Sequence, residues 1–183
     1  TGSGIYGVGC DGNLKIENVT VKATGTSGLY SYEGITINNA IVNAVGNGDN
    51  AIYSTKAVSI TNSSVTATAP SGDGIFIYNS YQNLTINNSM LTASVKSNGI
   101  NVSMGSVHVT NSFIDITTTD GFAIESRSGG GQKAISPYFT DGSDNYVVYA
   151  GDDSASATLI AEPDDTTYEN KYVKIVPAYD IWV

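Results

Sequence analysis

The sequence contains few basic residues, and this shortage excludes several kinds of partner. Lys and Arg together number 8 in the 183 residues, Arg127 being the single arginine, while Asp and Glu number 17, so the net charge is −9. Binding to nucleic acid or to an anionic membrane surface needs clustered Lys and Arg. No apolar run approaches the ~20 residues of a transmembrane helix. We therefore expect no nucleic-acid partner and no membrane insertion.

Cysteine and histidine are also scarce, with one residue of each, Cys10 and His108. One cysteine cannot form an internal disulfide, and the distant histidine argues against a catalytic thiol. Metal-site spacings such as CxxC and HxxxH are absent. We expect no cofactor, apart from calcium near Asp141 and Asp144, where a short acidic turn offers oxygen ligands. The chain opens without Met or a signal peptide, so we expect a longer parent protein with other domains.

The sequence is rich in Thr, Ser, Asn, Gly and Val, which favour strands and turns, and these residues form an internal repeat. Each unit opens with Gly or Ala followed by an apolar residue, at successive steps of 24, 23, 23, 25 and 22 residues. The openings are Gly4-Ile5, Gly28-Leu29, Ala51-Ile52, Gly74-Ile75, Gly99-Ile100 and Gly121-Phe122. Inside a unit, aliphatic residues alternate with polar ones, which predicts strands with one buried face.

Three short strands per unit cannot bury their inner face alone, so the units are expected to stack as rungs. The predicted fold is all-β: a single-stranded right-handed parallel β-helix of about five to six rungs of ~23 residues, over residues 1–126. The run "SRSGGGQK" (126–133) ends the pattern, and strand-like runs follow at 145–150, 157–161 and 171–178. Because the end of a solenoid exposes unpaired edges, we expect residues 127–183 to form a C-terminal β cap packed on the same domain.

One asparagine recurs in every unit, two residues after an aliphatic residue and three before another. The five are Asn18, Asn39, Asn62, Asn88 and Asn111. They fall at the expected bend between the second and third strands, where Asn tolerates left-handed backbone angles. Its amide can also bond to the amide one rung away, at about 4.8 Å. We interpret this column as a structural Asn ladder.

A second polar column precedes the unit openings. Its members are Ser27, Asn50, Asp73, Asn98 and Asp120. Short polar side chains suit a turn that leads into a strand, whereas the alternative is a calcium site shared between rungs. Only two of the five are carboxylates and they are not on adjacent rungs, which favours turn chemistry.

A third column is aromatic and is predicted to face outward from the first strand of each unit. Its members are Tyr6, Tyr30, Tyr53 and Phe76, with Asn101 and Ala123 ending the row and Tyr32, Tyr78 and Tyr81 close to it. A flat row of exposed rings can stack against sugar rings while polar neighbours bond the hydroxyls. Two alternatives stay open: stacking between rungs that only stabilises the sheet, or a row covered by another segment or chain. The ligand-binding candidates are Tyr6, Tyr30, Tyr53, Phe76, Tyr32 and Tyr78.

The stretches "GITINNAIVNA", "LTINNSMLTA" and "YVVYAGDDSASAT" with "KYVKIVPA" resemble β-helix modules of large secreted or wall-attached proteins of Gram-positive bacteria. Those modules are often labelled carbohydrate-binding-domain-containing or adhesin-like. The resemblance implies a secreted or cell-surface bacterial module that binds polysaccharide or host glycan. More distantly, the Asn ladder is similar to that of pectate lyases and their relatives, which cleave polysaccharides.

The residues themselves do not identify a catalytic site. A lyase of this shape needs a calcium-binding acidic cluster with an Arg or Lys base, and a glycosidase needs two carboxylates about 5–5.5 or 6.5–9.5 Å apart. The outward columns show no paired acids on adjacent rungs, and Glu17 and Glu33 are isolated. We therefore expect a non-catalytic glycan-binding or adhesin-like module. The alternatives are a fragment of a polysaccharide lyase or glycoside hydrolase, and a structural stalk or spacer.

Overall fold

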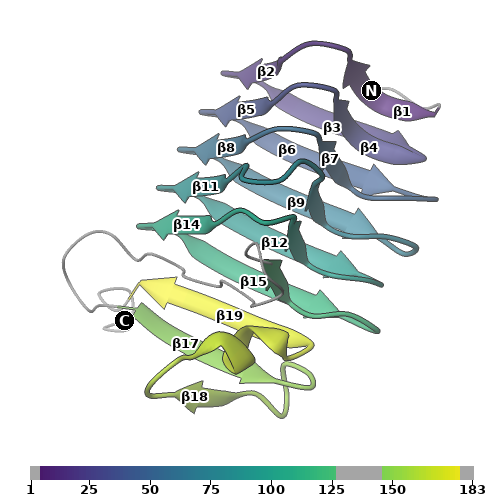
Figure 1. Cartoon of the computed structure of the whole chain (residues 1–183). Coiled ribbons are helices and arrows are strands. Elements are labelled where there is room, and N and C mark those ends of the chain that lie inside the picture. Colours follow the sequence, from purple (N-terminus) through teal and green to yellow (C-terminus); the bar gives the residue numbers. More distant parts are fainter. Residues whose placement is uncertain (1–4, 127–145, 178–183) are drawn as a thin grey trace.

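The computed structural model describes residues 5–126 and 146–177, and the first range winds into a parallel β-helix (Figure 1). Five complete rungs contain three strands each, and a sixth rung begins with its first strand. The strands are β1 (Tyr6–Cys10), β2 (Leu14–Glu17), β3 (Thr20–Gly25), β4 (Ser27–Ser31), β5 (Ile35–Asn38), β6 (Ile41–Gly46), β7 (Ile52–Ser54), β8 (Val58–Thr61), β9 (Ser64–Ala69), β10 (Ile75–Ile77), β11 (Leu84–Asn87), β12 (Met90–Val95), β13 (Ile100–Val102), β14 (Val107–Thr110), β15 (Phe113–Thr118) and β16 (Ile124–Ser126).

Equivalent strands of successive rungs pair in parallel and form three sheets. The first sheet has the order β1-β4-β7-β10-β13-β16, and the second has the order β14-β11-β8-β5-β2. The third runs β3-β6-β9-β12-β15 and continues into the C-terminal strands. Ile60 pairs with Ile37 of the preceding rung and Ile86 of the following rung, so the stacked repeat predicted from the sequence is confirmed.

The core is a column of aliphatic side chains between the three sheets. Ile37, Ile60 and Ile86 are fully buried, whereas Thr36, Ser59 and Thr85 on the same strands face outward. Fully burying an Ile side chain contributes about 1.5–3 kcal/mol, so every rung adds a similar increment. The period-two alternation therefore predicted the buried face correctly.

Two predicted unit openings are wrong. The opening of the first unit was placed three residues too early, and that of the last unit two residues too early. Val8 pairs with Leu29 and Ile124 pairs with Ile100, so these units open at Gly7-Val8 and Ala123-Ile124. Gly121-Phe122 instead belongs to the preceding turn, and Gly4 lies outside the described residues. A Cβ on Gly7 would lie 2.4 Å from the backbone nitrogen of Thr24, so this close approach requires glycine.

The Asn ladder exists, and its backbone conformation is its common property. All five asparagines have positive φ, between 45° and 53°. Asn39 Nδ2 donates to Asn18 Oδ1 at 2.7 Å, but the side chains of Asn62 and Asn88 bond to none of the described residues. The backbone N–H of each Asn in the first four rungs donates to a carbonyl of the next rung at 3.0–3.2 Å. The left-handed corner therefore accounts for the repeated Asn better than bonding between amides does.

A second ladder, of serines, follows the asparagines directly and was overlooked in the sequence. The N–H groups of Ala40, Ser63 and Ser89 each donate to the Oγ of the equivalent serine one rung on, at 3.1 Å. Those serines, which end with Ser112, in turn donate to the carbonyl two residues before them. The Asn-Ser pair in three consecutive units was the visible signal.

The C-terminal strands lie where the sequence predicts strands, and they extend the third sheet (Figure 1). They are β17 (Tyr146–Gly151), β18 (Thr158–Ile160) and β19 (Tyr172–Pro177), with a 3-10 helix η1 (Asp165–Glu169). β19 pairs antiparallel with β15, opposite Ile114 and Ile116. Ala123 N–H donates to Asn170 O at 2.9 Å, and Asn111 N–H donates to the Tyr146 hydroxyl at 2.6 Å. These oxygens accept hydrogen bonds from N–H groups whose equivalents in the earlier rungs donate to the next rung.

Candidate functional site: an aromatic strip with a polar flank

The predicted aromatic row lies on the outer side of the first sheet. Tyr30, Tyr53 and Phe76 are in register on β4, β7 and β10. Tyr6 pairs with Ser27, and the backbone partner of Tyr30 is Gly9. The Tyr6 ring nevertheless covers Gly9, since its Cγ lies 3.2 Å from where a Gly9 Cβ would be. Because Gly9 has no side chain, the Tyr6 ring can lie over it and stack on Tyr30, although Tyr6 is not the backbone partner of Tyr30.

The rings stack on one another and do not form the flat row predicted from the sequence. The centroids of Tyr6 and Tyr30 are 4.1 Å apart with an interplanar angle of 17°, and those of Tyr30 and Tyr53 are 5.1 Å apart at 8°. Phe76 contacts Tyr53 edge-on at 5.7 Å. The rung spacing of about 4.8 Å lies within the range of ring stacking, so neighbouring rings cover each other's faces. Burial raises the pKa of both Tyr30 and Tyr53.

Two further tyrosines border this row and are much more exposed. Tyr32 and Tyr78 lie two residues after Tyr30 and Phe76, and their exposed fractions are 61% and 58%. The Tyr78 centroid is 6.4 Å from that of Tyr53. We call the six residues the aromatic strip: Tyr6, Tyr30, Tyr53, Phe76, Tyr32 and Tyr78. Tyr81, also expected near the row, is 74% exposed in the turn between β10 and β11.

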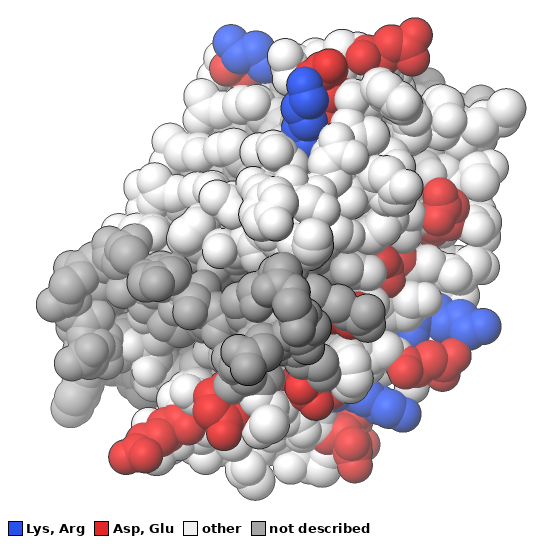
Figure 2. All heavy atoms as spheres, in the orientation of Figure 1, with Lys and Arg blue, Asp and Glu red and all other residues white. Residues whose placement is uncertain are grey.

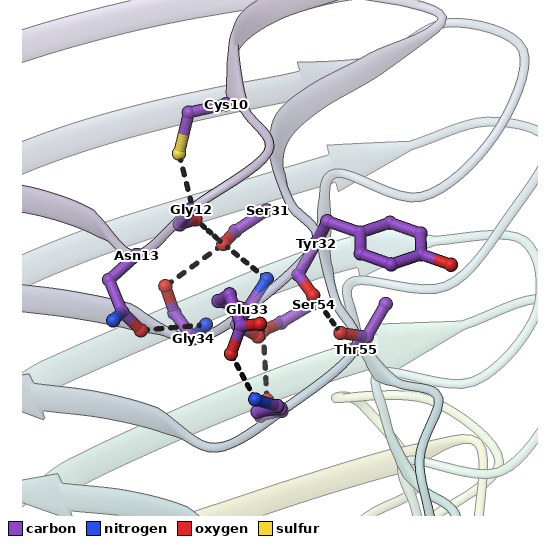
Figure 3. Close-up of polar contacts among 10 residues, drawn as sticks. Cys10, Gly12, Asn13, Ser31, Tyr32, Glu33, Gly34, Ser54 and Thr55 are labelled. Carbon is purple, nitrogen blue, oxygen red and sulfur yellow. Dashed lines mark hydrogen bonds and ion pairs between the residues drawn. The ribbon is translucent and has the colours of Figure 1, made fainter.

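Hydrogen bonds hold the turn that carries Tyr32, and Figure 3 shows its ring projecting away from them. Ser31 Oγ lies 2.7 Å from Gly12 O and 3.0 Å from Gly34 O, and its one hydroxyl hydrogen is shared between these two acceptors. The hydroxyl of Thr55, one rung on, donates to the Tyr32 carbonyl. Tyr32 N–H donates to Cys10 O at 3.2 Å, so the Tyr32 backbone is tied to both neighbouring rungs.

The second polar column forms a ladder of turn hydrogen bonds beside the strip. The N–H of Asp73 donates to Asn50 Oδ1 at 2.9 Å, and that of Asn98 donates to Asp73 Oδ1 at 2.7 Å. Phe122 occupies the equivalent position one rung after Asn98, because its N–H donates to Asn98 Oδ1. Assigning Asp120 to this column was therefore wrong. Ser27 Oγ donates to Asp49 Oδ2 at 3.2 Å. The turn interpretation of the column agrees with these bonds.

Two buried carboxylates lie at the end of the strip, and the sequence analysis missed them as a pair. The row continues in register from Phe76 through Asn101 to Glu125, not to Ala123 as predicted. Asn101 Nδ2 donates to Asp73 Oδ2, and Asn98 Nδ2 donates to Glu125 Oε2, both at 2.9 Å. Burial raises the pKa of Asp73, although the hydrogen bonds that its carboxylate accepts from Asn98 N–H and Asn101 Nδ2 oppose the shift. Because the last unit was predicted to open two residues too early, Ala123 was assigned to the row in place of Glu125.

The other polar candidates form local contacts. Glu17 and Glu33 are each paired with a lysine, Lys15 at 3.0 Å and Lys56. Cys10 Sγ donates to Gly12 O at 3.0 Å, and His108 is half-buried on β14. In residues 5–126 and 146–177 no three His, Cys, Asp or Glu side chains are grouped to hold a metal. The predicted calcium residues Asp141 and Asp144 lie outside the described residues.

Comparison with known proteins adds no family to this picture. No protein-family model matches the chain, and no curated protein or solved structure matches it significantly. The described part of the chain also contains no helix of the length and apolarity that crossing a bilayer requires. The geometry of the strip and the sequence motifs are therefore the basis for a functional proposal.

Proposed function

We propose that this β-helix is a non-catalytic module of a secreted or cell-surface bacterial protein and that it binds a glycan through the aromatic strip. The observation that carries the proposal is the exposure of Tyr32 and Tyr78, 61% and 58%, beside a stacked aromatic row. Contiguous exposed apolar surface on a soluble protein commonly marks an interaction site. The Gram-positive surface modules that the sequence resembles are consistent with this role.

The strip offers the two kinds of contact that a sugar requires. An exposed tyrosine ring provides an apolar surface for the C–H groups of a sugar ring, and its hydroxyl both donates and accepts hydrogen bonds. Tyr32 and Tyr78 are two rungs apart, a separation of about 9.6 Å along the helix, which suits every second sugar of one extended chain. The Tyr78 ring contacts Tyr53 and Phe76, and hydrogen bonds hold the Tyr32 backbone, which reduces the entropy that both residues lose on binding.

A glycan array followed by titration of the best ligand tests the proposal. The Tyr32→Ala/Tyr78→Ala double variant should lose at least tenfold in affinity, because both exposed rings are removed. Leu159→Ala is the matched control, since Leu159 is 60% exposed on β18 and lies outside the strip. Equal affinity of the double variant and the parent chain would exclude the strip as the binding site.

A second candidate function, a polysaccharide-cleaving fragment, is favoured by Asp73 and Glu125. A glycosidase needs two carboxyl groups, one of which holds a proton near neutral pH, and burial shifts the pKa of Asp73 in that direction. Release of reducing ends that disappears in Glu125→Gln would establish this activity. Binding without such release supports the module, and the absence of both supports a stalk or spacer of a larger protein.

A further inference from the structure

A groove runs along the corner between the second and third sheets, away from the aromatic strip. Its volume is about 800 Å³, and it extends over all five complete rungs. The small residues that follow the ladder asparagines form its floor, where Ala40, Ser63 and Ser89 are buried. The asparagines form one wall, and the first residues of the third-sheet strands form the other. The groove lining comprises Asn18, Val19, Thr20, Asn39, Ala40, Ile41, Asn62, Ser63, Ser64, Asn88, Ser89, Met90, Asn111, Phe113 and Pro177.

The groove is uncharged in a strongly acidic protein. None of its lining residues is Asp, Glu, Lys or Arg, although the chain carries a net charge of −9. Figure 2 shows the same character at the ends of β5 and β8, where uncharged atoms form the surface. Lys174 Nζ lies 5.3 Å from the ring centroid of Phe113 at the fifth rung, but the lining residues themselves offer no partner for a charged ligand, so the lining favours a neutral one.

One wall presents amide groups that are available for hydrogen bonding. Asn62 and Asn88 are exposed, and their side chains bond to none of the described residues. Each amide carries two donors and one acceptor oxygen, a combination that suits the hydroxyl groups of a sugar. The backbone N–H groups of both residues already donate to the next rung, at 3.0 Å. A peptide adding as a β-strand needs free backbone groups, so this wall does not favour a peptide.

The opposite wall is mixed: Ile41, Met90 and Phe113 are apolar, whereas Thr20 and Ser64 carry hydroxyl groups. Ile41 is 58% exposed and Met90 is 43% exposed, whereas Phe113 on the fifth rung is half-buried, with Lys174 Nζ 5.3 Å from its ring centroid. An amide wall facing a partly apolar wall matches a sugar chain, which has hydroxyl edges and C–H faces. The five asparagines are separated by four rung steps, or about 19 Å, so the groove is long enough to contact several units of an extended polymer.

We infer that this groove binds an extended, neutral polysaccharide, with the amides of Asn62 and Asn88 contacting its hydroxyl groups and Ile41 and Met90 contacting its C–H faces. This site is separate from the proposed glycan site on the aromatic strip. A chain bound here lies along the helix axis and contacts successive rungs. Affinity should therefore increase with polymer length until all five rungs are occupied.

Affinity electrophoresis in gels that contain mixed-linkage β-glucan, arabinoxylan or galactomannan tests the inference, with polygalacturonate as the charged comparison. The Asn62→Gly/Asn88→Gly variant removes two amides but keeps the left-handed backbone, which glycine adopts readily. The Ile41→Thr/Met90→Thr variant alters the other wall at exposed positions. Each should weaken retardation by at least one neutral polysaccharide tenfold or more, whereas Tyr32→Ala/Tyr78→Ala should retain it.

Several results would overturn the inference. They are no retardation by any of the three neutral polysaccharides, equal retardation of the Asn double variant and the parent chain, and stronger retardation by polygalacturonate. Binding of poly-L-proline in the groove without polysaccharide binding would assign it to a peptide instead. A loss seen only in the tyrosine variant would support the strip and reject the groove, so the two proposals fail separately.

Discussion

Replacing Asn62 in the central rung separates the two explanations of the Asn ladder. Asn62 has φ 49°, and its exposed side chain bonds to none of the described residues. Alanine at this position would pay the cost of a left-handed backbone, roughly 1–2 kcal/mol, without losing a side-chain hydrogen bond. Glycine avoids that cost and should lose only about 0.4–1 kcal/mol through the greater freedom of the unfolded chain. We therefore expect stability to fall in the order Asn62, Asn62→Gly, Asn62→Ala.

Urea unfolding followed by far-UV circular dichroism measures this order from the midpoints, provided that the slopes agree. Asn39 supplies the comparison, because its amide donates to Asn18 at 2.7 Å. Asn39→Gly should lose about 0.5–1.5 kcal/mol more than Asn62→Gly does, the usual contribution of one hydrogen bond. If Asn62→Gly proved as unstable as Asn62→Ala, the left-handed corner would not explain the ladder.

Two other predictions concern the polar flank and the C-terminal end. Because burial raises the pKa of Asp73 above 3.8, the folded protein binds its proton more tightly than the unfolded chain does. Stability should fall as pH rises from 3.8 through the raised pKa, and Asp73→Asn should flatten this dependence in unfolding midpoints measured from acid to neutral pH. Tyr146→Phe removes the hydroxyl that accepts from Asn111 N–H, so it should lower the free energy of unfolding by about 0.5–1.5 kcal/mol. No loss in Tyr146→Phe, beside a clear loss in Tyr146→Ala, would show that the ring matters and the hydroxyl does not.

The repeat, the corner and the buried face could be predicted because each follows from local chemistry. An aliphatic residue at every second position, as in Val58 and Ile60, specifies which side of a strand faces inward. Asn at a fixed place in each unit indicates a left-handed residue there, whatever the rest of the chain does. Equal spacing of these signals then requires units that stack in register.

Register at the two ends depended on pairing that no local signal reveals. Gly4-Ile5 and Gly121-Phe122 carry the same pattern as true openings, but the hydrogen bonds place Val8 and Ile124 in those positions. The Tyr6 ring stacks on Tyr30, although the backbone of Tyr6 pairs with Ser27. The same difference in register hid Glu125, and with it the contact network around Asp73.

The sequence by itself determined a stack of three-stranded rungs with asparagine corners, because strand alternation and backbone preference are properties of neighbouring residues. Only the tertiary structure decided that the tyrosines cover one another's faces, and that an uncharged groove lies beside the ladder. Ring orientation depends on the space that adjacent rungs leave, and a groove exists only between side chains brought together from five separate units. Both candidate binding surfaces therefore arise from stacking and not from any single stretch of the chain.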